Sequence, residues 1–178
     1  VSCTSAGALA LNSRQDGMVG RDVTAGDAGD GRLGFSYSRV GSYGLDECVK
    51  DNITGLTWEG KLPAGAGIRA YNGEYTNFGD GRSGDASAYV AAVNAAALCG
   101  FGDWRLPTVD EMQSIIDYSV TIGPPMLDTT WFVNSTRTHY WTATEYAGAL
   151  NQAWHIETEY GASSPIERSR RFAVRLVR

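Results

Sequence analysis

A chain of 178 residues suits a single domain, with a core large enough to fold without metals or disulfides. Its composition, 43% hydrophobic and 20% charged, is that of a globular domain and argues against disorder. The net charge of −5 argues against nucleic acid and anionic membranes as partners. No apolar run approaches the length of a membrane span.

The first part of the chain is poor in structural signals. Residues 1–34 are rich in Gly, Ala, Asp and Ser, and residues 1–45 are expected to form an irregular lead to the domain. A β-hairpin is predicted next, because turn residues at 51–55 separate the apolar pairs at 48–49 and 56–58. Trp58 is expected in the core.

An acidic, glycine-rich loop precedes the first predicted helix. Asn77, Asp80 and Asp85 offer oxygen ligands of the kind that Ca²⁺ prefers, but the EF-hand spacing is absent and a solvated loop is favoured. We expect no cofactor beyond this structural Ca²⁺ candidate. Asp85 is positioned to cap a helix over residues 86–98, which Cys99 and Gly100 then end.

The most consistent local signals lie in residues 99–117. Two glycines make a turn, Pro107 favours an extended residue before it, and Thr108 with Glu111 forms a capping-box pattern. The apolar residues that follow have helical spacing. We expect this segment to be scaffold, with Trp104 in the core and Arg105 paired to a carboxylate or to backbone carbonyls.

Three strands are predicted in the last third of the chain, at residues 139–144, 153–156 and 171–178. The alternation in the last strand points Phe172, Val174 and Leu176 to one side and Arg175 to the other. If Ile156 faces the core, the same alternation turns His155 and Glu157 outward.

Three cysteines leave an odd count. Without a CxxC pair, and with only two histidines, a zinc site is improbable. One disulfide and one further thiol fit better, and we predict the pair Cys48 and Cys99. A disulfide implies an oxidising compartment. For Cys3, a free thiol, an intermolecular bridge and a lipid-modified processed N-terminus all stay open.

Five motifs, in order and spacing, resemble the Lcl C-terminal domain family over residues 46–178. They are Cys48–Glu59, Leu98–Met112, Tyr140–Thr144, the pair Ala153-Trp154, and Val174–Arg178. The pattern departs from the family at Thr158, where an aromatic residue is usual, and at Ala173.

This resemblance implies one α+β domain over residues 1–178 with a C-type-lectin-like fold: two helices, a small twisted antiparallel sheet and long irregular loops that form a binding face. It also implies a secreted, cell-surface or virion-surface location. Some relatives are reported as adhesins for sulfated polysaccharides, sometimes as trimers, so a homo-oligomer is one arrangement to test. Others with this fold are variable proteins of diversity-generating retroelements.

The candidate binding residues lie between residues 144 and 171, where Tyr, Asn, Ser and Arg supply contact area and adaptable hydrogen bonds. An ordinary polar surface is the alternative, and the resemblance favours a binding face. The candidates are Thr144, Tyr146, Asn151, Gln152, His155, Glu157, Glu159, Tyr160, Ser163, Ser164, Glu167, Arg168 and Ser169.

Two further interpretations concern charged side chains. His155 with Glu157 and Glu159 suggests acid–base chemistry or a metal site, but no recognisable nucleophile accompanies them, so we expect no enzyme and no metal there. The calcium-dependent sugar motifs of true C-type lectins are also missing.

An arginine cluster could bind sulfate or carboxylate groups instead. It comprises Arg168, Arg170, Arg171, Arg175 and Arg178.

The sequence therefore predicts a non-enzymatic domain that binds a protein or glycan through its C-terminal loops, with a retroelement variable protein as one form. The alternatives are an adhesin that uses the arginine cluster and a purely structural module.

Overall fold

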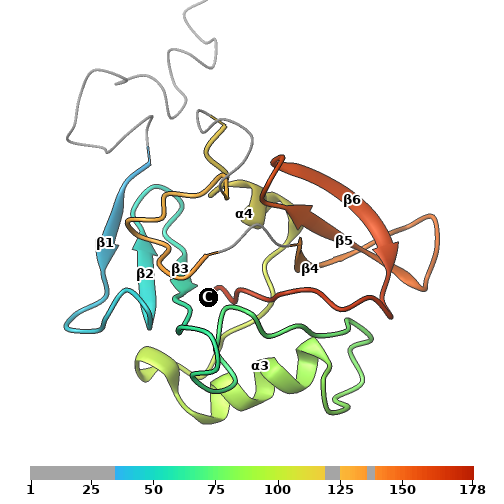
Figure 1. Ribbon diagram of the computed structural model, residues 1–178, viewed down its shortest axis with the longest axis horizontal. Helices are drawn as coiled ribbons and strands as arrows, with labels where there is room; N and C mark the ends of the chain where they lie inside the picture. Colours follow the sequence, from blue (N-terminus) through green and yellow to red (C-terminus); the bar gives the residue numbers. More distant parts are fainter. Residues whose placement is uncertain (1–34, 119–124, 136–138) are drawn as a thin grey trace, which may run out of the picture. The chain divides into compact units, whose positions relative to one another are not determined.

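The computed structural model describes residues 35–118, 125–135 and 139–178 (Figure 1). Predictions on residues 1–34, including those on Cys3 and most of the irregular lead, lie outside these ranges. The chain divides into two compact units, Val1–Ser38 with Asp51–Gly55, and Arg39–Lys50 with Leu56–Arg178. In the first unit the Asp51 carboxylate accepts hydrogen bonds from the Ile53 and Thr54 backbone, which shapes the turn.

The first sheet has the strand order β1-β2-β3, with β1 at Tyr37–Arg39, β2 at Cys48–Asp51 and β3 at Thr57–Glu59. Strands β2 and β3 pair antiparallel, with Cys48 opposite Glu59. This confirms the predicted hairpin. All three residues of β3 are buried, so β3 carries a carboxylate, Glu59, into the interior.

Helix α3 spans Ala86–Ala95, and the Asp85 side chain caps it by accepting from the Ser87 amide, as predicted. The helix ends three residues before the predicted end. Ala97 and Cys99 have φ values of 48° and 54°, in the left-handed region that a continuing helix cannot use. A single 3-10 turn, Leu98–Gly100, takes up the rest of the segment.

Helix α4 spans Val109–Gln113 and begins with the predicted capping box between Thr108 and Glu111. Arg105 donates to both carboxylate oxygens of Glu111, each at 2.7 Å, which confirms the predicted carboxylate partner. The Glu111 carboxylate thus holds the turn and the helix start together, and the Arg105 hydrogen bonds lower its pKa.

The second sheet is antiparallel, with β4 at His139–Glu145, β5 at Gln152–Glu157 and β6 at Ala162–Glu167. The first two strands confirm the prediction. Strand β6 was predicted as loop, because its Ser and Pro residues are depleted in strands. Pro165 is tolerated there because β6 is an edge strand, where one side of the backbone needs no partner.

The predicted third strand at residues 171–178 is wrong in one respect. This segment forms only isolated bridges, from Val177 to Trp58 and Arg105, from Ala173 to Tyr140 and from Phe172 to Tyr75. It therefore links both sheets, and residues 173–177 are buried irrespective of alternation. Arg175, predicted on the side opposite Val174, is as buried as its apolar neighbours.

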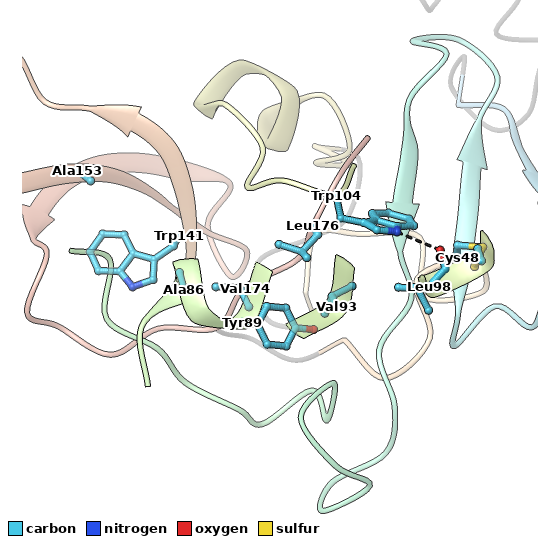
Figure 2. Packing of buried hydrophobic residues seen from close by; sticks show 11 residues of the cluster. Cys48, Ala86, Tyr89, Val93, Leu98, Trp104, Trp141, Ala153, Val174 and Leu176 are labelled. Carbon is cyan, nitrogen blue, oxygen red and sulfur yellow. Dashed lines mark hydrogen bonds between the residues drawn. A yellow bond between two sulfur atoms is a disulfide. The ribbon is translucent and has the colours of Figure 1, made fainter. Parts of the chain in front are cut away.

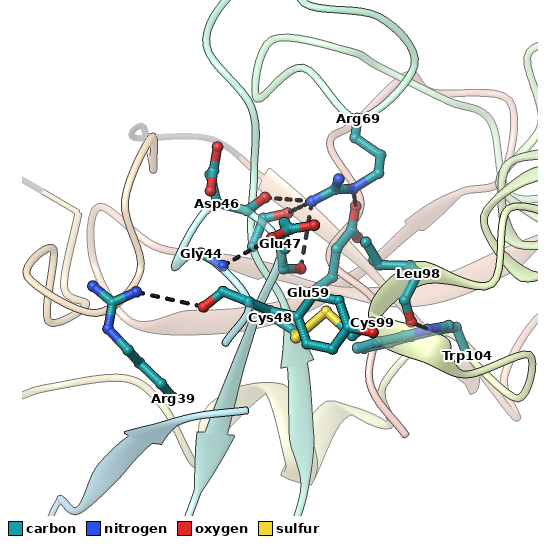
Figure 3. Close-up of a disulfide and its surroundings, with 12 residues drawn as sticks. Arg39, Gly44, Asp46, Glu47, Cys48, Glu59, Arg69, Leu98, Cys99 and Trp104 are labelled. Atoms are coloured by element: carbon teal, nitrogen blue, oxygen red, sulfur yellow. Dashed lines mark hydrogen bonds and ion pairs between the residues drawn. A yellow bond between two sulfur atoms is a disulfide. The ribbon is translucent and has the colours of Figure 1, made fainter. Parts of the chain in front are cut away.

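The hydrophobic core gathers residues from α3, both sheets and the last segment (Figure 2). Trp104 lies in it, as predicted, and its indole nitrogen donates to the Leu98 carbonyl at 3.0 Å. The predicted disulfide is confirmed, since Cys48 and Cys99 are bonded and tie β2 to the turn after α3 (Figure 3). Within the described residues the chain is an α+β protein with two α-helices, and it has two small antiparallel sheets where one was expected. No helix in the described ranges has the length and apolar character to cross a membrane.

Candidate functional site

The register of the second sheet divides the predicted binding residues between its two faces. Residues opposite one another in an antiparallel pair share a face, and neighbours along a strand alternate. One face, here called the Trp154 face, carries Tyr140, Gln152, Trp154, Ile156, Ser163, Pro165 and Glu167. The other, the His155 face, carries His139, Trp141, Ala153, His155, Glu157, Ser164 and Ile166.

The Trp154 face is buried at one end and open at the other. Ile156 is fully buried, whereas Gln152, Trp154 and Pro165 are half-buried and Glu167 is exposed. The ring of Tyr146 meets that of Trp154 edge-on, with centroids 5.9 Å apart. The open end thus presents an aromatic pair beside polar side chains.

Arg168 fixes the loops at this open end. Its guanidinium pairs with Glu145 at 2.8 Å and donates to the carbonyls of Gln152 and Asn77, both at 3.3 Å. The Arg168 amide also donates to the Asn151 carbonyl at 2.9 Å. These contacts connect β4, the loop before β5 and the loop after β6. We call this surface the hairpin end, and it comprises Tyr146, Asn151, Gln152, Trp154, Glu167, Arg168 and Ser169.

The turn between β5 and β6 lies at the opposite end of the hairpin. Six paired residues separate the two ends, which is roughly 17–20 Å of strand. Tyr160 lies in this turn and is 53% exposed, and Glu159 lies beside it in the sequence. The predicted binding residues therefore do not form one surface. Tyr160 and Glu159 are separate from the hairpin end, and Thr144, a half-buried residue of β4, accepts a hydrogen bond from the Val109 amide of α4.

The outward orientation predicted for His155 is wrong. Its side chain is buried, with 1% of the residue exposed, because Phe172 and Trp141 cover the His155 face. As the alternation predicts, the side chains of His155 and Ile156 point to different faces of β5. Both faces are covered at this position, so both residues are buried. Burial, followed by the charge of His139, lowers the pKa of His155, so the neutral imidazole is favoured. Glu157 remains half-buried.

The five arginines of the predicted cluster differ in burial and have different partners. Arg175 is buried and donates to the Glu59 carbonyl at 2.6 Å. Arg178 pairs with Asp103 at 2.6 Å and covers the ring of Phe101. Arg170 and Arg171 are exposed, and Arg171 donates to the Glu74 carbonyl at 2.9 Å.

The three Ca²⁺ candidate residues all have protein partners. The Asp85 carboxylate accepts from the side chains of Thr76 and Ser87 as well as from backbone amides, and these contacts lower its pKa despite burial. Asp80 pairs with Arg82, and the Asn77 amide donates to the Thr142 carbonyl at 3.1 Å. The carboxylates of Asp80 and Asp85 thus organise the loop before α3, and the Asn77 side-chain nitrogen ties this loop to β4.

Sequence reasoning missed two residues of these surfaces. Trp154 is not among the predicted binding residues, yet it is half-buried at the hairpin end. His139 was taken only as the start of a strand, yet its register partner is Glu157 and its ring lies 5.0 Å from that of His155. Only the pairing of β4 with β5 brings these side chains together, and no short sequence pattern signals it.

The fold and the hairpin end define an α+β domain in which a buried frame carries an exposed β-hairpin. The model of the Lcl C-terminal domain family matches residues 47–178, and the chain belongs to this family. The match agrees with the span of the resemblance in the sequence. No curated protein matches the chain.

Proposed function

We propose that this domain is a non-enzymatic ligand-binding domain that binds a protein or glycan through the hairpin end. The observation that supports this most is the Tyr146–Trp154 aromatic pair, set among polar side chains and held by the Arg168 contacts. Rigid aromatic side chains lose little conformational entropy on binding and combine contact area with polar atoms. The disulfide is compatible with display in an oxidising, extracellular setting.

A glycan and protein array, followed by affinity measurements on any ligand found, tests this proposal. Tyr146→Ala and Trp154→Ala should each weaken binding at least about tenfold, as expected for aromatic anchors of an interface. Tyr160→Ala is the matched control, because Tyr160 is an exposed aromatic residue at the other end of the hairpin. Equal losses in all three variants, or none in the first two, would contradict the assignment.

A finer form of the proposal is that the hairpin end is diversified by a retroelement. The β-hairpin lies near the C-terminus, where a rigid frame tolerates variation in exposed loops. Genomic DNA tests this directly. A near-duplicate of the 3′ coding segment beside a reverse transcriptase gene supports diversification, and its absence removes this option.

Polyanion binding is the second candidate, supported by the exposure of Arg170 and Arg171 next to Arg168. It is weaker than the first, because Arg175 and Arg178 are engaged elsewhere. Retention on heparin that falls steeply with salt, and is lost on charge reversal of Arg168, Arg170 and Arg171, would favour it. No retention at low salt would dismiss it.

A further inference from the structure

A second cluster of chemically capable side chains lies on the His155 face, on the other side of the sheet from Trp154. His139, His155 and Glu157 come from β4 and β5 and present potential ligand atoms that all lie within 4.8 Å of one another. The Glu157 carboxylate lies 3.7 Å from His139 Nδ1 and 3.6 Å from His155 Nε2. This is the only such group of three found in the described residues.

These distances are too long for hydrogen bonds and suit a shared ion instead. Hydrogen bonds between such groups are 2.7–3.2 Å long. Two ligand atoms each about 2.05 Å from one tetrahedral ion lie roughly 3.3 Å apart. Small side-chain rotations would therefore bring the two imidazoles and the carboxylate to bonding distance from one ion.

The buried nitrogen atoms provide an independent indication. His139 Nδ1 and both ring nitrogens of His155 are buried, and within the part of the chain that the structure describes none makes a hydrogen bond of good geometry, although the Ser164 backbone and the Glu157 carboxylate interact with His155. A buried polar atom without a hydrogen bond destabilises the fold. A bound cation would satisfy His139 Nδ1 and His155 Nε2 together.

We propose that His139, His155 and Glu157 form a binding site for a divalent transition-metal ion of the zinc type. Two imidazoles and one carboxylate are ligands that Zn²⁺, Co²⁺, Ni²⁺ and Cu²⁺ accept, whereas Ca²⁺ and Mg²⁺ prefer sites made of oxygen atoms alone. The inference is independent of the proposed function, because the hairpin end lies on other residues.

The surroundings of the cluster suit such a site. The ring of Phe172 stacks on His139 at 4.6 Å and lies 4.8 Å from His155, so an apolar wall limits rotation of both imidazoles. On the other side the His139 and Glu157 side chains are 44% and 29% exposed. Three protein ligands with an open side leave a fourth position for water or for an anionic group of a ligand.

Zinc titration of the full chain by calorimetry tests the proposal, in a Cys3→Ser background that removes the remaining thiol. We expect one ion per chain. His139→Gln, His155→Gln and Glu157→Gln should each weaken binding at least about tenfold, since even indirect metal partners contribute that much. Glu167→Gln, which removes an exposed carboxylate on β6, is the matched control and should leave affinity unchanged.

Co²⁺ provides a second readout that is independent of folding energetics. Visible absorption bands typical of a four- or five-coordinate ion should appear in the parent protein and in Glu167→Gln, and should be lost in His139→Gln. Far-ultraviolet circular dichroism identifies any variant that fails to fold, and His139→Gln is informative because the His139 side chain is partly exposed. No zinc binding at millimolar concentration, or binding equal in the parent and all three ligand variants, would overturn the proposal.

Discussion

Two buried polar clusters in this chain satisfy their charges in different ways. The buried Glu59 carboxylate accepts from Tyr89, Lys61 and the Leu176 amide. Figure 3 shows Glu59 with Arg69, a second cation of this cluster. Around His155, the carboxylate of Glu157 lies beyond hydrogen-bond reach of both imidazoles. In the first cluster the carboxylate is paired and hydrogen-bonded within the protein. In the second cluster the imidazole nitrogens that could bind a ligand make no hydrogen bond of good geometry.

The difference shows how to separate a structural polar cluster from a candidate site. Glu59 is a single buried carboxylate beside Lys61, Arg69 and Arg175, and its backbone and side chain bind the last segment to β3. Its role is to hold the frame. Unpartnered nitrogen atoms in a solvent-adjacent cluster contribute nothing comparable to the frame, and so point to an external partner.

The largest effect is expected from Glu59→Gln. The change leaves Lys61 and Arg69 without their carboxylate, and breaking a buried ion pair in this way costs about 3–5 kcal/mol. Urea unfolding in EDTA measures the loss. Glu157→Gln is the matched control and should change the free energy of unfolding by less than about 1 kcal/mol. Equal losses would show that the two clusters do not differ as described.

Reduction of the Cys48–Cys99 disulfide should cause the next largest loss in the free energy of unfolding. Cys48 is the register partner of Glu59, so the bond secures the strand pair on which the Glu59 cluster depends. The loop that it closes spans 51 residues, and loss of such a bond typically costs about 2–4 kcal/mol. Unfolding with and without a reductant measures this, and Cys48→Ser with Cys99→Ser should reproduce it. An unchanged unfolding midpoint would show that the disulfide does not stabilise this part of the fold.

Lys61 should give the Glu59 cluster a characteristic pH dependence. Burial, which outweighs the attraction of Glu59, lowers the pKa of Lys61 to about 8, against about 10.4 in the unfolded chain. Between these values the unfolded state binds more protons, so the free energy of unfolding should rise with pH, by at most about 1.4 kcal/mol per unit. Below pH 8 the full cost of burying the ammonium remains.

Lys61→Met should flatten this rise between pH 8 and about 9.5, before the tyrosines of the unfolded chain ionise. Urea unfolding at several pH values measures the slope in the parent and the variant. Lys50→Met is the control, because Lys50 lies on β2 and is only half-buried. The same slope in Lys61→Met as in the parent would show that Lys61 is not buried in its charged form.

The smallest effect is expected from His155→Leu in EDTA. Neither buried nitrogen of the imidazole makes a hydrogen bond of good geometry, and a leucine of similar size replaces the ring without that penalty. The free energy of unfolding should therefore change by less than about 1 kcal/mol. A loss above about 3 kcal/mol would show that His155 stabilises the fold even without an ion. The His155 cluster would then resemble the Glu59 cluster in its contribution to stability.

Features that depend on residues a few positions apart could be predicted from the amino-acid sequence. Asp85 and Thr108 cap their helices with hydrogen bonds that span two or three residues. The turn at residues 51–55 and the strands that flank it likewise depend on residues close together in the sequence. The family match also follows from the order of the motifs, since residues 47–178 fit the family model.

Which side chains meet, and which of them are buried, became clear only from the three-dimensional fold. Strand β6 looks like a loop until β5 pairs with it, and the last segment is covered on both sides because it bridges two sheets. His139 and Glu157 become neighbours through strand register. Register and burial depend on contacts between distant parts of the chain, and these are set by the packing of the whole domain rather than by local preference.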